Sequence, residues 1–276
     1  MSKLTPEDVV LRYSKRGMNI LKKYLKDGYC RTAAEKLLHA ERGTVLLTTG
    51  FYVAGYAETD GPLGTVAVAE ALNQLGFHSV VVTDKYCKGF FELKQLDVEY
   101  VDIAADEQVY EDILDKYHPV YMISIERCGE NAEHEYANMR GVSITSETAA
   151  IDHLFELAPE KHIPTIGVGD GGNEIGMGNV KDIISEKLEL NPCVVPVDDL
   201  IIATTSNWGA YALTAWLQKL SGEEVLFTFA EAEPYLAATL EIGSVDGVLK
   251  EKKMGVDGFD MTVEKEILDS LAEAIA

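Results

Sequence analysis

The sequence predicts an α/β fold in which a largely parallel sheet is flanked by helices on both faces, a three-layer α/β/α arrangement. Short apolar runs rich in β-branched residues alternate along the chain with longer segments that carry apolar residues at helical spacing. The apolar runs are continuous rather than alternating with polar residues. This is typical of strands that are buried on both faces of a parallel sheet. The order of the strands in the sheet does not follow from the sequence.

The predicted elements alternate in a regular order. Two helices come first, over residues 6–26 and 32–40. The predicted strands are 44–49, 79–83, 98–103, 120–125, 165–168 and 200–204. The predicted helices between and after them are 62–75, 106–117, 147–157, 181–188 and 208–220. Pro62 in the first turn and Gly76 after the last support the helix over 62–75. A Gly/Asp-rich stretch from 243 to 260 and a helix over 263–276 close the chain.

We expect one domain over the 276 residues, because 47% of them are hydrophobic and no biased tract interrupts them. Within it we distinguish N-terminal helices over 1–42, an α/β core over 43–230, and a Gly/Asp-rich stretch with a closing helix over 231–276.

Charge and cysteine usage exclude several classes of protein. There are 24 Lys and Arg against 46 Asp and Glu, a net charge of −22, and such a surface repels a nucleic acid. The four cysteines are widely spaced without a CxxC pair, which favours reduced thiols in a reducing compartment. No apolar run approaches the roughly 20 residues of a membrane helix, and the N-terminus is unlike a signal peptide. We therefore expect a cytoplasmic protein without membrane or nucleic-acid partners; a homo-oligomer stays open.

The segment from Gly167 to Gly178 follows the fifth predicted strand and is the sharpest local signal. Six of its twelve residues are glycine, so its backbone can turn tightly and approach a ligand closely. Asp170, Asn173 and Glu174 offer the oxygen ligands that Mg²⁺, Mn²⁺ or Ca²⁺ prefer. A phosphate-binding loop and a purely structural turn are the alternatives, although two acidic side chains would repel a phosphate.

Further candidates follow other strands, and the carboxyl ends of parallel strands meet at one edge of a sheet. After the first strand come Gly50, Glu58, Asp60 and Gly61. We assign Glu58 to a metal and Asp60 to catalysis, with a solvated carboxylate and a helix cap as their alternatives. We assign Gly50 and Gly61 to substrate binding, since the N-terminus of the helix that begins at Pro62 can receive a carboxylate.

The fourth and sixth strands supply the remaining candidates. Glu126 is a predicted catalytic residue, and Arg127 and Arg140 are predicted to bind a substrate carboxylate. A buried ion pair is the alternative for Glu126 and Arg127. Asn207 is also predicted as catalytic, with a helix N-cap as its alternative. Asp257, in the Gly/Asp-rich stretch, is interpreted first as a turn former and only second as an extra acidic group.

These same segments resemble the D-glutamate cyclase C-terminal domain family. The resemblance rests on Thr49–Thr65, Glu126–Gly129, Gly167–Gly178 and Ser206–Gly209, and it covers most of the chain. It implies a lyase that converts D-glutamate to 5-oxo-D-proline and water. The vertebrate enzyme of the family also carries a separate N-terminal domain, similar to hydro-lyases, that these 276 residues do not contain.

The implied chemistry suits the candidate residues. A divalent ion held by Asp170, Glu174 and either Glu58 or Glu126 would act as a Lewis acid on the γ-carboxylate. Asp60 would serve as the base, because neighbouring negative charges raise its pKa. Two other functions stay open: a divalent-metal-dependent phosphatase or related hydrolase, and a non-enzymatic module that binds an amino acid or a cation.

Overall fold

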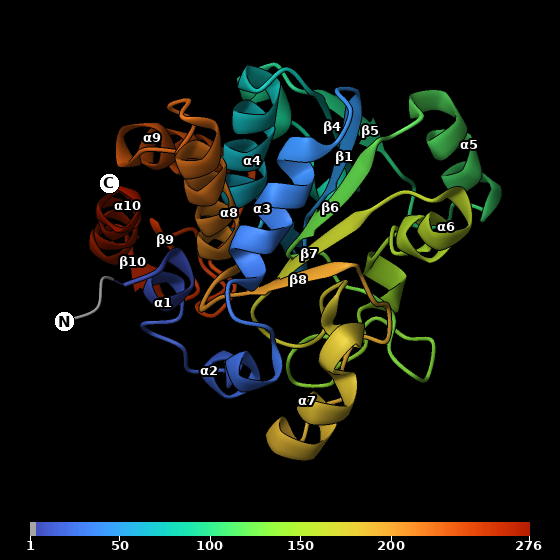
Figure 1. The fold of residues 1–276 in the computed structure, drawn as a ribbon. Coiled ribbons are helices and arrows are strands. Elements are labelled where there is room, and N and C mark those ends of the chain that lie inside the picture. The colour runs from blue at the N-terminus through green and yellow to red at the C-terminus, as the bar shows by residue number, and fades with distance from the viewer. Residues whose placement is uncertain (1–3) are drawn as a thin grey trace.

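The computed structural model describes residues 4–276 and has a six-stranded parallel sheet between two layers of helices, which confirms the predicted fold class (Figure 1). The strand order is β5-β4-β1-β6-β7-β8. The strands are β1 (Thr44–Thr48), β4 (His78–Thr83), β5 (Asp97–Tyr100), β6 (Tyr121–Ile125), β7 (Thr165–Gly169) and β8 (Asp199–Ile202). Strands β6 and β7 are buried along their whole length, as their continuous apolar sequences predict.

The helices divide between the two faces of this sheet (Figure 1). Helices α3, α4 and α8 pack together on one face, whereas α5 and α6 pack together on the other. The longer helices are α3 (Tyr29–His39), α4 (Pro62–Gln74), α5 (Gln108–Tyr117), α6 (His153–Lys161), α7 (Lys181–Leu188), α8 (Ser206–Ser221), α9 (Phe229–Ile242) and α10 (Met261–Ile275). The short elements are α1 (Pro6–Val10), α2 (Met18–Leu21), β2 (Tyr52–Val53), β3 (Tyr56–Ala57), β9 (Gly255–Val256) and β10 (Phe259–Asp260).

The strand order places a crevice in the middle of the sheet. Strands β1 and β6 are neighbours, but β1 leads to α4 on one face and β6 leads to α6 on the other. Because the two chains leave in opposite directions, a crevice opens beyond the carboxyl ends of β1 and β6. This is the position at which doubly wound α/β sheets bind ligands.

Several predicted elements need correction. The predicted helix over 6–26 is wrong: α1 ends at Val10, and Gly17 adopts φ 88° before α2 begins. The predicted helix over 147–157 is shifted to His153–Lys161, so a long loop follows β6. Helix α9 was not predicted, although Thr228 and Glu231 form a capping box at its start. The β2–β3 hairpin was also missed; Ala54 and Gly55, at φ 51° and 96°, form its turn.

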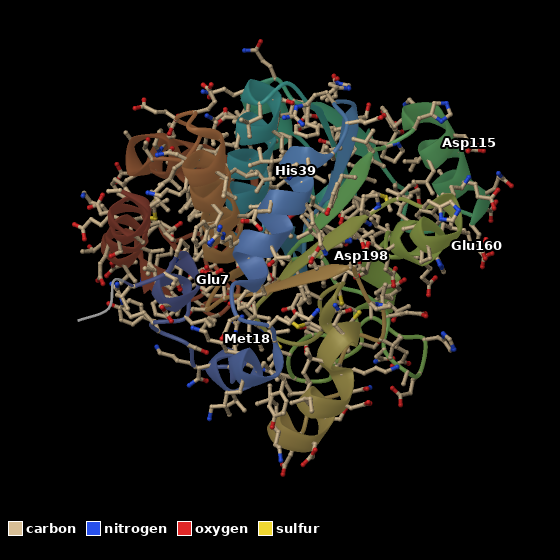
Figure 2. All side chains as sticks on the ribbon, in the orientation of Figure 1. Glu7, Met18, His39, Asp115, Glu160 and Asp198 are labelled. Atoms are coloured by element: carbon tan, nitrogen blue, oxygen red, sulfur yellow. The ribbon has the colours of Figure 1, made fainter. Side chains whose placement is uncertain are left out.

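Much of the acidic excess lies on the surface. Asp115 and Glu160 are exposed on α5 and α6, where Figure 2 shows their side chains at the edge of the molecule. Within residues 4–276, none of the helices is both long and apolar enough to cross a membrane.

Candidate functional site

Three buried carboxylates meet at the crevice between β1 and β6. Asp60 follows β1 and the β2–β3 hairpin, Glu126 directly follows β6, and Asp170 directly follows β7. Each offers one carboxylate oxygen, and these three oxygens lie within 4.8 Å of one another. The exposed fractions of the three residues are 1%, 5% and 0%. The sequence predicted that these strand ends would meet, and the structure brings them together.

The backbone at Glu126 is built to bring its side chain into this group. Glu126 adopts φ 49°, which is uncommon for a residue with a side chain, and Ser206 Oγ donates a 2.5 Å hydrogen bond to its carboxylate. Gly61 lies against it at φ 97°, and a Cβ at that position would come within 2.9 Å of Glu126 Cβ. Gly61 therefore meets two requirements, a left-handed backbone and a close approach.

Asp60 and Asn207 cap each other's helices. Asp60 accepts hydrogen bonds from the backbone N–H groups of Ser206 and Asn207, at 2.8 and 2.7 Å, at the first turn of α8. In return, Asn207 Oδ1 accepts from the N–H groups of Gly61 and Gly64, at 2.9 and 2.7 Å, at the start of α4. The cap expected for Asp60 thus exists, but on α8 instead of α4. Both helix N-termini face the site, and their dipoles partly offset its negative charge.

Arg16 is the cation in direct contact with this group. Its Nη1 lies 2.7 Å from Asp170 Oδ1 and 2.8 Å from Asp257 Oδ2. Arg16 comes from the segment between α1 and α2, and Asp257 from the turn between β9 and β10. The guanidinium of Arg16 therefore joins an N-terminal segment and a C-terminal turn to the residue that follows β7.

The carboxylates are too many for one arginine to neutralise. Burial, then Asp257 and Asp60, raise the pKa of Glu58 well above its ordinary value. Burial and Asp257 raise the pKa of Asp60 to about 8, although the capping N–H groups oppose the shift. Burial raises the pKa of Glu126 and of Asp170 well above the ordinary values, with neighbouring acids adding to it. At neutral pH the group therefore retains protons or binds a cation.

The glycine-rich loop is organised by Glu174. Its carboxylate accepts the N–H groups of Gly171 and Gly172, each at 2.7 Å, so both of its oxygens bind the loop that carries them. Asn173 Nδ2 donates to the carbonyl oxygen of Ala137 at 2.7 Å. Both oxygens of Glu174, a predicted metal ligand, thus stabilise the loop, whereas Asp170 belongs to the carboxylate group.

A small cavity of about 190 Å³ opens beside the carboxylates. It is smaller than the roughly 300–1,000 Å³ clefts that take drug-sized ligands. Glu58, Glu126, Asn138 and Asn173 give it polar acceptors; Arg16, Arg140 and Lys250 give it positive charge; the apolar lining includes Phe51, Val53, Met139 and Ile144. Asp60 and Asp170 lie behind this lining. Such a cavity suits a small molecule that carries both signs of charge.

Three predicted substrate-binding residues do not line the cavity. Arg127 is fully buried and donates to Gly50 O at 2.8 Å, Asp84 at 2.6 Å and Ala149 O at 2.6 Å. Its buried ion pair, the open alternative, is formed with Asp84 and not with Glu126. Gly50 and Gly61 use their backbone groups within the protein, on Arg127 and on Asp60 and Asn207. Arg140 does line the cavity.

Sequence reasoning missed Arg16, Ser206 and Lys250 as site residues. Arg16 and Lys250 lie in lysine- and arginine-containing stretches near the two ends of the chain, and nothing local in the sequence distinguishes a basic side chain that contacts the site from a solvated one. The contact of Ser206 to Glu126 joins residues 80 positions apart, so no local pattern indicates it.

Comparison with known proteins identifies the family of the chain. The family model described as D-glutamate cyclase-like, C-terminal, matches residues 7–272. The human protein "D-glutamate cyclase, mitochondrial" is 32% identical over 259 residues, a stretch that covers 80% of this chain and 40% of the human protein. The chain therefore spans less than half the length of this relative. The human protein's name places it in mitochondria, and the cytoplasmic location of the present chain stays a prediction.

Solved structures show only weak likeness. The UDP-glucose 4-epimerase of Brucella ovis, in complex with NAD, is 16% identical with a TM-score of 0.33, over 54% of this chain and 49% of its own. The WbmG enzyme of Bordetella bronchiseptica, in complex with NAD and UDP, is 12% identical with a TM-score of 0.32, over 64% and 50%. At these values neither likeness carries an inference about ligand or reaction.

Proposed function

The chain belongs to the D-glutamate cyclase-like C-terminal family, and from that premise we propose that it converts D-glutamate to 5-oxo-D-proline and water. The observation that carries the proposal is the group of buried carboxylates beside a small cavity whose lining includes both acidic and basic side chains. The family indicates the reaction, and the cavity offers the groups which that reaction needs.

The cavity suits the charges of glutamate. Arg140 and Lys250 are exposed side chains on its lining and would bind the α-carboxylate. Glu58 and Glu126 line the same cavity and would face the ammonium group and the γ-carboxylate. Arg127, whose donors contact Asp84 and backbone carbonyls, has no part in this arrangement.

Ring closure forms a bond between the amine nitrogen and the γ-carboxyl carbon and breaks one carbon–oxygen bond. The ammonium group loses two protons, and the departing oxygen leaves with both of them as water. Glu126, protonated because burial and like charges raise its pKa, would donate a proton to the γ-carboxylate oxygen. Glu58, in its ionised form, would accept one proton from the ammonium group and pass it to the departing oxygen, and Glu126, after giving up its own proton, would accept the second. The predicted base, Asp60, lies behind the lining and holds the start of α8.

A divalent ion fits the residues behind the cavity. Asp60 and Asp170 would hold it through two of the three oxygens that lie within 4.8 Å of one another, and Glu126, which carries the third, would keep its proton toward the cavity. These hard oxygen donors suit Mg²⁺, Mn²⁺ or Ca²⁺. An ion there would polarise the γ-carboxylate and would relieve the repulsion that the pKa shifts reveal. Arg16 already offsets part of the charge on Asp170, and a divalent ion would offset more of the charge that remains.

The test is product formation by this chain alone. Protein treated with a chelator is incubated with D-glutamate, with and without added Mn²⁺ or Mg²⁺, and 5-oxoproline is followed by chromatography. We expect product that depends on the added ion. Absence of product under both conditions would contradict the proposal. Metal binding without product would favour a binding module or a hydrolase.

A further inference from the structure

Asn173 carries a buried acceptor without a partner. Its Nδ2 donates to Ala137 O at 2.7 Å, which fixes the amide so that Oδ1 points the other way. Oδ1 has no hydrogen-bond partner among residues 4–276, and the residue is only 7% exposed. A buried carbonyl oxygen without a donor has lost its hydrogen bonds to water and gained none, so a native protein seldom leaves one without a reason.

The residue that carries this acceptor lines the cavity. Asn173 lines it together with Glu58 and Glu126, which also offer oxygen atoms. The glycine loop holds the amide in place, because Asn173 is the residue before Glu174, whose carboxylate binds the N–H groups of Gly171 and Gly172. An ammonium group has three N–H donors, and the Glu58 carboxylate and Asn173 Oδ1 can accept two of them.

An ammonium group fits Asn173 better than a metal ion does. Asn173 lines the open cavity, whereas Asp60 and Asp170, the two carboxylates that would hold an ion, lie behind the lining. A ligand in the cavity therefore reaches Asn173 directly. An amide oxygen also accepts a hydrogen bond without adding a negative charge to an already crowded group.

We infer that Asn173 Oδ1 accepts a hydrogen bond from the substrate's ammonium group, and that Asn173 thereby selects an amino dicarboxylate over the same dicarboxylate without the amino group. The inference rests on the proposed function, because it concerns the same cavity. It replaces the prediction that Asn173 is a metal ligand with a role in substrate recognition.

The experiment compares two ligands on one variant. Binding of D-glutamate and of glutarate, which has hydrogen in place of the ammonium group, is measured by calorimetry on the parent and on Asn173→Ala. We expect the preference for D-glutamate to fall about tenfold or more in the variant, as for a lost hydrogen bond to a charged group. Mn²⁺ affinity should stay at the parent value. Asn173→Asp retains an acceptor and should restore the preference.

Asn138→Ala is the matched control, because Asn138 also lines the cavity but its Oδ1 already accepts from Arg140 N and Val142 N. It should weaken both ligands alike and leave their ratio unchanged. An unchanged ratio in Asn173→Ala, with parent binding intact, would overturn the inference and leave the proposed function standing. A loss of Mn²⁺ affinity in Asn173→Ala would overturn it in favour of a metal ligand. A parent that binds neither ligand would overturn both.

Discussion

Two groups of buried charged side chains contain the consecutive residues Glu126 and Arg127, and they differ in how their charges are neutralised. Arg127 has Asp84 and two backbone carbonyls as acceptors, and only its Nε lacks a partner among residues 4–276. The other group has Asp60, Glu126 and Asp170 within reach of one another, with Arg16 as the cation in contact. The first group is balanced by the fold itself, whereas the second is not.

The difference separates a structural role from a chemical one. A buried ion pair with its hydrogen bonds made holds three segments of chain together, since Arg127 joins the end of β1, the residue after β4 and the loop after β6. A buried group with excess negative charge costs stability, and its raised pKa values prepare it for proton transfer or for a cation. Substitutions in the balanced group should therefore change mainly the free energy of unfolding.

Replacing Arg127 by Met should have the largest effect on stability. It leaves Asp84, 3% exposed, without its cation. We expect a loss of about 3–5 kcal/mol in the free energy of unfolding, measured with urea. The exposed Arg140→Met is the control and should stay within about 0.5 kcal/mol of the parent. Equal effects of the two changes would contradict the structural role of Arg127.

A third, smaller group of buried polar side chains consists of Glu264, Trp208 and Tyr211. Its carboxylate accepts from Trp208 Nε1 at 2.6 Å and from Tyr211 Oη at 2.9 Å, so both oxygens are used. In Glu264→Gln the amide nitrogen would face one of these donors, and we expect a loss of about 1–3 kcal/mol in urea unfolding. The rate of 5-oxoproline formation should stay close to that of the parent. A large fall in this rate without a loss of stability would contradict the comparison, because it would show that a buried group with all its hydrogen bonds made also takes part in the reaction.

Asp170→Asn should weaken the binding of Mn²⁺, because it removes one of the three carboxylates. We expect a loss of at least tenfold in calorimetry, about 1.4 kcal/mol. Glu264→Gln serves as the control and should bind Mn²⁺ as the parent does. Unchanged affinity in Asp170→Asn would show that the ion, if bound, lies elsewhere.

The pH dependence of the free energy of unfolding should reveal the excess charge of the carboxylate group. The pKa of Asp60 is raised from 3.8 to about 8 in the folded chain, so the folded state holds its proton longer than the unfolded state does. This group's contribution to the free energy of unfolding is therefore present at low pH and is lost as the pH rises toward about 8, by at most about 1.4 kcal/mol per pH unit for one proton. Urea unfolding with a chelator present measures it.

The matched variant is Asp60→Asn, which removes the titrating group. The stability difference, parent minus variant, should decrease as the pH rises from about 4 to about 8. A difference that grows with pH over this range would mean that the carboxylate of Asp60 is stabilised by the fold.

The sequence predicted what depends on neighbouring residues. The apolar runs located the six strands, and because strands of a parallel sheet end at one edge, the acids after β1, β6 and β7 were expected to meet there. The family followed from the same segments. Its assignment is confirmed by the match over residues 7–272.

What depends on contacts between distant segments could not be predicted. Arg16 reaches Asp170 across 154 positions, and Asp60 binds the N–H groups of α8 across 146 and 147 positions. Arg127 and Arg140 look alike in the sequence, but only the fold shows that one is buried against Asp84 and the other lines the cavity. The break after α1 was missed for the same reason, since the segment that carries Arg16 is shaped by the site it closes.

The most direct measurement is the rate of 5-oxoproline formation from D-glutamate by Glu126→Gln beside the parent. Glu126 is the one member of the three-carboxylate group that also lines the cavity. The account predicts a rate lower by about 100- to 10,000-fold, as for loss of a general acid, with a midpoint of unfolding no lower than that of the parent because glutamine is uncharged like the protonated acid that it replaces. A rate within about tenfold of the parent would contradict the claim that this unneutralised group carries the chemistry.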